Sequence, residues 1–249
     1  MRSVLYRYTL FAVAFLLFSC KTQLVRTASN EQYYTIDSTL AADSTIIAYY
    51  TPYKQQLESE MSRVLGFADQ HLTHSRDAQS LMGNFFVDAL LWKGQQLDPE
   101  VQASFATKGG IRSDIKAGDI TVGHLFEVMP FENVLSIVTL SGTDMLRWAD
   151  YMAQTGGQPA GGIKLVIEDG KVKEFLVQGK PIDPNASYKL VTYDYLSNGG
   201  DYVTFFDKLL ARKDYTQRIR ETLMEYVSEL TKQGKHVQSR LDERIQIIK

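Results

Sequence analysis

The sequence predicts one layered domain of the α/β (α+β) class, a single domain with a mixed sheet and helices. Segments with helical spacing alternate with β-rich runs, and at least one pair of runs reads as a hairpin, which argues against an all-β sandwich. The 44% hydrophobic and 22% charged residues are ordinary for a globular chain. About 200 residues follow the N-terminal region, which is enough for one sizeable core.

Two helices are expected first. Apolar residues at helical spacing from Leu57 to Ala68 predict an amphipathic helix over about Tyr53 to His71, with one buried face. A second helix, from about Ser80 to Gln95, is apolar on most sides and should lie near the centre of the fold.

The following elements are mostly strands. Val101 to Ala106 is β-rich, and Val134 to Leu140 is a strand that ends at Ser141-Gly142-Thr143-Asp144, a capping-box pattern that opens a helix. That helix carries an apolar side formed by Met145, Trp148, Ala149 and Met152.

The C-terminal half continues the pattern. Asp169-Gly170 separates the runs Ile163 to Glu168 and Lys173 to Val177, which predicts a hairpin because this dipeptide adopts positive φ angles. Tyr188 to Tyr193 is a further strand. A late helix is marked by Ile219, Leu223, Val227 and Leu230.

The N-terminus predicts export. Arg2 and Arg7 flank a short apolar stretch from Leu10 to Phe18, which is too brief for a spanning helix but typical of a secretory signal. It ends at Ser19-Cys20, and Cys20 is the single cysteine of the chain, a pattern that resembles a bacterial lipobox. The alternatives are an ordinary signal peptide with an incidental cysteine, or a core cysteine.

The domain boundaries follow from this pattern. Residues 1–20 are interpreted as a lipoprotein signal peptide with its lipidated cysteine, residues 21–43 as a flexible polar tether, and residues 44–249 as the folded domain. The protein is therefore expected to be exported and lipid-anchored in the bacterial cell envelope, on a periplasm-facing membrane, with the outer membrane favoured. Without other cysteines, the exported chain has no disulfide framework.

Charge excludes one class of partner. The formal net charge is −2, and the chain has no long basic run or aromatic-basic stripe. We therefore expect no nucleic acid polymer as a partner.

Two glycine pairs are the candidate binding loops. Gly109-Gly110 follows the β-rich run and precedes Arg112, so backbone N–H groups and a guanidinium could meet an oxyanion there. Gly199-Gly200 forms a second turn, between Asn198 and Asp201.

Two aromatic residues accompany these turns. Phe131 follows Pro130, and Tyr195 precedes the second glycine pair, so the two rings could sandwich a purine or pyrimidine base. The alternative is that both rings belong to the core. Their turn-rich surroundings favour exposure.

These motifs together resemble the C-terminal, nucleotide-recognising domain of the 5'-nucleotidase family, over roughly Arg76 to Phe206. The resemblance is carried by Met82-Gly83-Asn84 with Asp88-Ala89, by Lys108-Gly109-Gly110-Ile111-Arg112, by Gly118-Asp119 with Pro130-Phe131, and by Asn198-Gly199-Gly200-Asp201. Thr107 and Lys108 stand where the family usually has asparagine and a third glycine, Gln79 where it has glutamate, and Tyr195 where it has phenylalanine.

The resemblance implies substrate contacts. Phe131 and Tyr195 would stack on the base, Arg76 and Arg112 would hold the phosphate or ribose side, and Asp201 would bind the ribose hydroxyls. Asn198 is included among the substrate-binding residues. The backbone of Gly109, Gly110, Gly199 and Gly200 would line the site.

The resemblance also implies a missing catalytic part. In the family a separate N-terminal domain holds two divalent metals with Asp, His and Asn ligands. This chain has four histidines, and Asp69-Gln70-His71 is not followed by the family's other metal motifs. His71 and His74 are interpreted as exposed helix-end residues, with metal ligation as the alternative. We therefore assign no catalytic residue, metal or other cofactor to this chain.

Two functions remain open. The first is a membrane-anchored recognition subunit that binds a nucleotide or nucleoside and acts with a separately encoded metallophosphoesterase domain. The second is a non-catalytic ligand-binding lipoprotein of the envelope. Whether the chain is an enzyme by itself stays open, and we expect it to be inactive alone.

Overall fold

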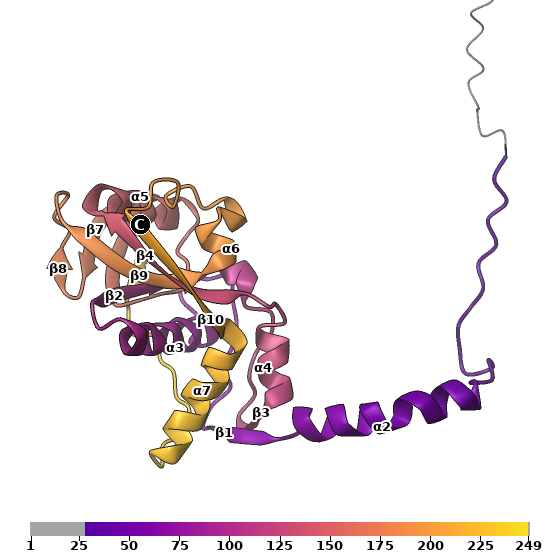
Figure 1. Cartoon of the computed structure of the whole chain (residues 1–249). Helices are drawn as coiled ribbons and strands as arrows, with labels where there is room; N and C mark the ends of the chain where they lie inside the picture. The colour runs from indigo at the N-terminus through magenta and orange to yellow at the C-terminus, as the bar shows by residue number, and fades with distance from the viewer. Residues whose placement is uncertain (1–27, 249) are drawn as a thin grey trace, which may run out of the picture. The chain divides into compact units, whose positions relative to one another are not determined.

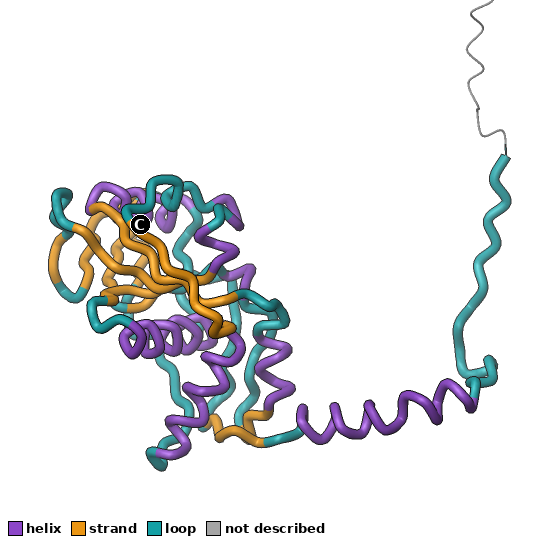
Figure 2. The backbone as a smooth tube through the Cα atoms, in the orientation of Figure 1, coloured by secondary structure: helices purple, strands orange, loops and turns teal. Residues whose placement is uncertain are grey.

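The computed structural model describes residues 28–248, and these divide between residues 49 and 50 into two units. Cys20, the signal sequence and the start of the expected tether lie outside the described residues. In the first unit, residues 28–43 contain no helix or strand, and α2 (Ser44–Met61) begins at residue 44 (Figure 2). Among the described residues, no helix combines the length and apolar character needed to cross a membrane.

The prediction of a helix with a buried face over Tyr53 to His71 is wrong. Helix α2 ends at Met61 and has no buried residue, and β1 (Val64–Ala68) follows it. The apolar residues at helical spacing include exposed positions of α2 and positions of β1, so the helical period extends by chance into a strand. Gly66 allows β1 to pack closely against the late helix, because a Cβ there would lie 2.5 Å from Oγ1 of Thr231 in that helix.

The main sheet of the second unit is mixed, as predicted. Its strand order is β10-β4-β9-β2-β5, and β2 pairs with β9 in parallel while the other pairs are antiparallel. These strands are β2 (Val101–Phe105), β4 (Val134–Ser141), β5 (Ala160–Gly161), β9 (Ser187–Tyr193) and β10 (Ala211–Arg218).

Helices cover both faces of this sheet (Figure 1). On one side lie α3 (Leu81–Leu97) and α7 (Ile219–Lys232), and on the other lies α5 (Gly142–Gln154). Two neighbouring residues of β2 show the two faces directly. Ser104 donates from its hydroxyl to the carbonyl of Val87 in α3 (2.7 Å), whereas Phe105 packs edge-on against Trp148 of α5. The core is therefore two layers of apolar side chains, one on each face of the sheet.

The second sheet contains the predicted hairpin. Its order is β11-β6-β7-β8, formed by β11 (Ile245–Ile248), β6 (Ile163–Glu168), β7 (Lys171–Val177) and β8 (Lys180–Pro181). Asp169 and Gly170 both have positive φ, 50° and 74°, which confirms the expected turn. A small sheet pairs β1 with β3 (Gly118–Thr121), which leads into α4 (Val122–Val128).

The expected helices α3, α5 and α7 are confirmed, with one correction to a cap. Ser141 accepts a hydrogen bond from the Asp144 N–H (3.1 Å), as a cap residue should. The Asp144 carboxylate does not complete the capping box. It accepts from the Ser141 hydroxyl (2.6 Å) and from Arg147 (2.8 Å).

Candidate functional site

The first glycine turn follows β2 and forms a short 3-10 turn, Lys108–Gly110. Its backbone N–H groups are largely used within the protein: Lys108 donates to Gln158 (2.9 Å), Gly110 to Thr107 (3.0 Å) and Arg112 to Val128 (2.9 Å). Gly110 is instead required for packing, because a Cβ there would lie 2.4 Å from the hydroxyl oxygen of Tyr193. The turn is therefore pressed against β9.

The second glycine turn follows β9 and the short helix α6 (Asp194–Ser197). Gly199 has a φ of 86°, and Asp201 and Tyr202 also have positive φ, 52° and 59°. Gly200 lies beneath the Tyr195 ring, since a Cβ would come within 2.5 Å of it. This contact determines where the exposed Tyr195 ring lies.

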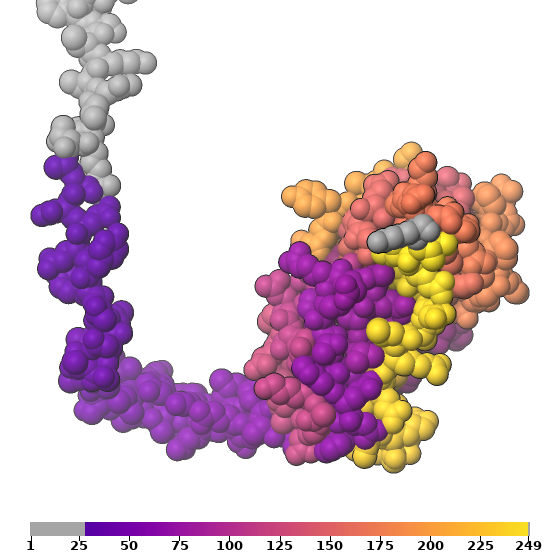
Figure 3. Space-filling view, turned by 180° about the vertical axis from the view of Figure 1, so that it is seen from behind, coloured from indigo at the N-terminus to yellow at the C-terminus, as the bar shows by residue number. Residues whose placement is uncertain are grey.

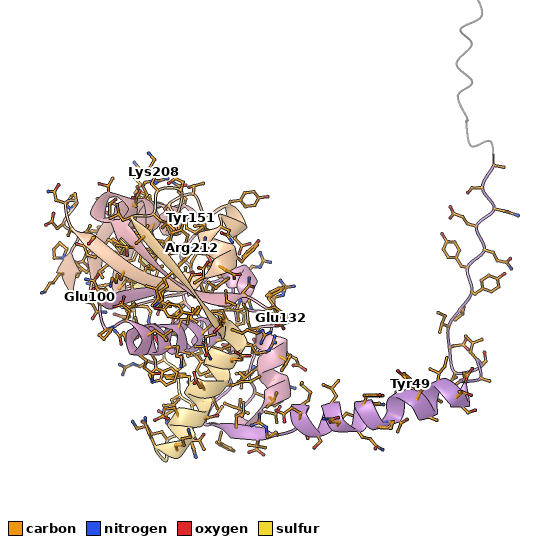
Figure 4. All side chains as sticks on the ribbon, in the orientation of Figure 1. Tyr49, Glu100, Glu132, Tyr151, Lys208 and Arg212 are labelled. Atoms are coloured by element: carbon orange, nitrogen blue, oxygen red, sulfur yellow. The ribbon has the colours of Figure 1, made fainter. Side chains whose placement is uncertain are left out.

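Asp201 joins the two turns. The Thr107 hydroxyl donates to Oδ2 of Asp201, and the Tyr195 hydroxyl donates to Oδ1 (3.1 Å). Tyr151, which is labelled in Figure 4 on α5, donates to the Asp201 backbone carbonyl (3.2 Å). Thr107 and Tyr195 thereby hold the Asp201 carboxylate, and Tyr151 holds the backbone of the same residue.

A cavity of about 840 Å³ opens where these turns meet. Its lining includes three cationic residues, Arg76, Lys108 and Arg112, together with Asp201. The remaining lining residues are His74, Ser75, Thr107, Gly109, Ile111, Tyr151, Thr155, Gln158 and Tyr202. Of the predicted site residues, Arg76, Gly109, Arg112 and Asp201 thus line one cavity.

Lys108 holds the cavity wall together. Its ammonium donates to the carbonyls of Arg76 (2.8 Å) and Gly156 (3.1 Å), and burial lowers its pKa. The sequence predicts no role for the Lys108 side chain. Its side chain connects the glycine turn to the Arg76 segment and to the turn after α5.

The two arginines differ in their surroundings. Arg112 donates from Nη1 to the Gly109 carbonyl (3.2 Å), and its guanidinium carbon lies 6.0 Å from the centre of the Phe131 ring. Arg76 is exposed, and its side chain makes no hydrogen bond or ion pair within residues 28–248. Both guanidinium groups therefore keep N–H donors for an anion.

The predicted stacking rings lie beside the cavity and outside its lining. Phe131 is 42% exposed and Tyr195 is 47% exposed, so neither ring belongs to the core. The segments that carry them are tied together by Asp194, whose Oδ1 accepts from Nδ2 of Asn133 (2.9 Å) and from the N–H of Tyr195 (2.9 Å). Each ring has one contact with a lining residue: Phe131 with Arg112, and Tyr195 with Asp201.

A buried arginine of α7, which no sequence motif predicted, positions the Phe131 segment. Arg220 is 5% exposed and donates to the carbonyls of Met129 (3.2 Å) and Phe131 (3.3 Å). It also pairs with Glu132 (2.6 Å) and stacks over Phe126 (3.8 Å). The available signal was a charged residue in a helix whose buried positions are mostly apolar.

Asn198 is not placed in the cavity. Its side-chain oxygen accepts a hydrogen bond from Arg212 (2.6 Å), and it is absent from the cavity lining. The amide therefore connects the second glycine turn to β10.

The two histidines are not helix-end residues, because α2 ends at Met61. His71 is exposed and pairs with Asp114 (3.0 Å). His74 lines the cavity, and its Nε2 is buried without a hydrogen-bond partner among the described residues. Within residues 28–248, no group of three His, Cys, Asp or Glu side chains is close enough to hold a metal ion.

The Gly83-Asn84 motif has a packing role in this chain. Asn84 is buried and donates to Gln79 (3.0 Å) and to the Arg240 carbonyl (2.8 Å). Arg244 pairs with Asp88 of the same helix (2.6 Å). Figure 3 shows the resulting arrangement, with the C-terminal segment in yellow lying along the purple segments of the second unit.

The family model of the 5'-nucleotidase C-terminal domain matches residues 57–208. The chain belongs to this family. The match covers both glycine turns, the cavity lining and the two exposed rings. It ends before α7, which supplies Arg220.

Relatives of this 5'-nucleotidase C-terminal domain are longer proteins. Protein UshA of Escherichia coli (strain K12) is 28% identical over 173 residues, which is 65% of this chain and 30% of UshA. Cell wall protein Lmo0130 of Listeria monocytogenes is 27% identical over 231 residues, which is 81% of this chain and 29% of that protein. The chain thus spans about 30% of the length of these curated relatives.

Solved structures agree in fold. The 5'-nucleotidase precursor from Thermus thermophilus superposes with a TM-score of 0.70 at 27% identity, over 82% of this chain and 42% of that chain. A putative 5'-nucleotidase from Staphylococcus aureus has a TM-score of 0.67 at 16% identity, over 86% of this chain and 46% of that chain, and supports the fold alone.

Proposed function

We propose that this chain is the nucleotide- or nucleoside-binding half of a 5'-nucleotidase-type phosphohydrolase and serves nucleotide catabolism. The observation that carries the proposal is the 840 Å³ cavity in which Arg76 and Arg112 lie together with Asp201. Guanidinium groups bind phosphate oxygens through paired N–H donors, and a carboxylate accepts hydrogen bonds from ribose hydroxyls.

The contacts of Asp201 leave room for a ribose. Each carboxylate oxygen has more than one acceptor site, and Thr107 and Tyr195 use one on each oxygen. The two hydroxyl donors hold the carboxylate in place. A sugar with two neighbouring hydroxyl groups would find a preorganised acceptor at this position.

The base would lie toward the exposed aromatic rings. Phe131 adjoins Arg112 and Tyr195 adjoins Asp201, so each ring flanks one end of the polar site. Stacking on such rings stabilises a base without requiring a particular base identity.

We propose that catalysis requires a separately encoded metallophosphoesterase domain. The length of UshA, of which this chain matches 30%, supports this division. Divalent metals in that partner would polarise the phosphate and activate water. This chain would contribute the alignment of the nucleotide.

We further propose export to the cell envelope and a lipid anchor on Cys20. The name of the relative Lmo0130, a cell wall protein, supports an exported location. The lipobox-like Ser19-Cys20 supports the anchor.

Calorimetric titration of AMP and adenosine tests the binding function. We expect Arg112→Ala to weaken AMP binding about tenfold or more and to change adenosine binding less than about threefold, because it removes a charge-assisted contact to phosphate. Arg63→Ala is the matched control, since Arg63 is an exposed arginine that pairs with Glu60 and does not line the cavity.

Two results would contradict the proposal. The parental chain could bind neither ligand, or Arg112→Ala could lower AMP and adenosine affinity equally. Binding without any copurifying phosphoesterase would instead favour a stand-alone ligand-binding lipoprotein.

A further inference from the structure

Tyr202 occupies a backbone conformation that suits glycine. Its φ is 59°, in the left-handed region, where the Cβ of an ordinary residue approaches the following carbonyl oxygen. Bulky residues are rare at such positions. The preceding Asp201 has the same conformation, with a φ of 52°.

Hydrogen bonds to Asp201 hold the strained turn in place, and the Tyr202 side chain adds no contact that would stabilise it. Thr107, Tyr195 and Tyr151 all donate hydrogen bonds to Asp201. A strained backbone conformation persists only where surrounding contacts fix it in this way. The Tyr202 side chain is 94% exposed and makes no hydrogen bond or ring contact within residues 28–248. The stability of the fold therefore does not account for a tyrosine at position 202.

The position of Tyr202 does offer an explanation. Tyr202 and Tyr151 are the two tyrosines of the cavity lining, and the Tyr151 hydroxyl is already bonded to the Asp201 carbonyl. Phe131 and Tyr195 do not line this cavity. Tyr202 thus places a residue with an exposed aromatic side chain in the lining of the same cavity as Arg76 and Arg112.

We infer that Tyr202 is a ligand-contacting residue whose ring stacks on the planar heteroaromatic base of a ligand held in the cavity. This inference rests on the proposed function. Because a flat base has two faces, Tyr202 would cover one face, and only one of the two rings predicted from the sequence, Phe131 or Tyr195, could cover the other. The ligand would have an aromatic end against Tyr202 and an anionic end against the guanidinium groups. Stacking would also remove part of the exposed ring from water.

Tyr202→Gly distinguishes a binding role from a structural role, because it should lower the affinity for AMP without lowering the melting temperature. Glycine adopts a positive φ without strain, so we expect the full-chain variant to melt no lower than the parent and up to about 4 °C higher. We expect its affinity for AMP to fall about ten- to a hundredfold, the loss typical of one stacked base. Tyr202→Phe keeps the ring and should bind AMP within about threefold of the parent.

Asp169→Gly is the matched control. Asp169 has a similar φ of 50° in the β6–β7 turn, is exposed, and does not line the cavity. It should leave AMP affinity unchanged. A Tyr202→Gly variant that binds AMP like the parent overturns the inference, as does one that melts well below the parent.

The outcomes distinguish this inference from the proposed function. If the parent binds AMP and Tyr202→Gly binds equally well, the role of Tyr202 is refuted while nucleotide binding stands. If the parental chain fails to bind AMP and adenosine, both are refuted.

Discussion

The Thr107 hydroxyl donates a hydrogen bond to the carboxylate of Asp201, which lies 94 residues further along the chain. This contact joins the turn after β2 to the turn after α6 and sets one wall of the cavity. Thr107 is 3% exposed, so the bond is sheltered from water on the Thr107 side.

Thr107→Val should therefore lower the free energy of unfolding by about 1–3 kcal/mol, since it removes a donor to a charged group and keeps the shape of the side chain. Urea unfolding provides the measurement. Thr107→Ser is the control, because it retains the hydroxyl. Equal unfolding midpoints for the Val and Ser variants would show that the bond contributes no stability.

Gly110→Ala should lower the free energy of unfolding by about 1–3 kcal/mol, because the added methyl group would lie 2.4 Å from the Tyr193 hydroxyl oxygen. Tyr193→Phe removes that oxygen, so it should reduce the cost of the alanine. A double-mutant cycle measures this coupling. A cost that is the same in both backgrounds would mean that the methyl group meets a different obstacle.

Tyr193 should make stability fall at high pH. Burial raises the pKa of its hydroxyl in the folded state, whereas the unfolded chain has the ordinary value of about 10. Above that value the unfolded chain releases the proton while the folded chain keeps it, so this residue's contribution to stability falls by about 1.4 kcal/mol per pH unit. The contribution is fully present below about pH 10.

Tyr193→Phe removes this titration. Urea unfolding between about pH 8 and pH 11 should show a parental free energy that decreases more steeply above about pH 10 than that of the variant. Parallel pH curves would contradict the buried, protonated Tyr193.

Sequence patterns predicted the elements whose burial is regular and missed those whose burial is not. The apolar side of α5 is regular because Trp148 and its neighbours pack on one face of the sheet. The apolar residues of α2 are exposed, so their spacing predicted a buried face that does not exist.

Some residues of the candidate site could likewise be predicted from the sequence and others could not. Arg112 and Asp201 could be chosen from their residue types and their neighbouring glycines, and both line the cavity. Tyr202 and Lys108 could not, because a positive φ at a tyrosine and a lysine directed at two carbonyls leave no pattern in a single sequence. The place of Asn198 before the glycines predicts a ligand contact, and in the structure its side-chain oxygen accepts a hydrogen bond from Arg212.

Cys20→Ala tests the proposed anchor, which lies outside the described residues. We expect the variant to move from the membrane fraction to the soluble periplasm or to remain unprocessed, since acyl chains provide the membrane affinity. Fractionation of cells that produce the parent and the variant measures this. Unchanged membrane partitioning would assign the attachment to another part of the chain.

Hydrogen–deuterium exchange with and without saturating AMP tests most directly whether the nucleotide occupies the cavity between the two glycine turns. We expect slower exchange in peptides that cover Thr107 to Arg112 and Gly199 to Val203, with little change in α7 (Ile219–Lys232). Exchange that is unaffected at both turns under saturating AMP, or protection confined to α7, would contradict this expectation.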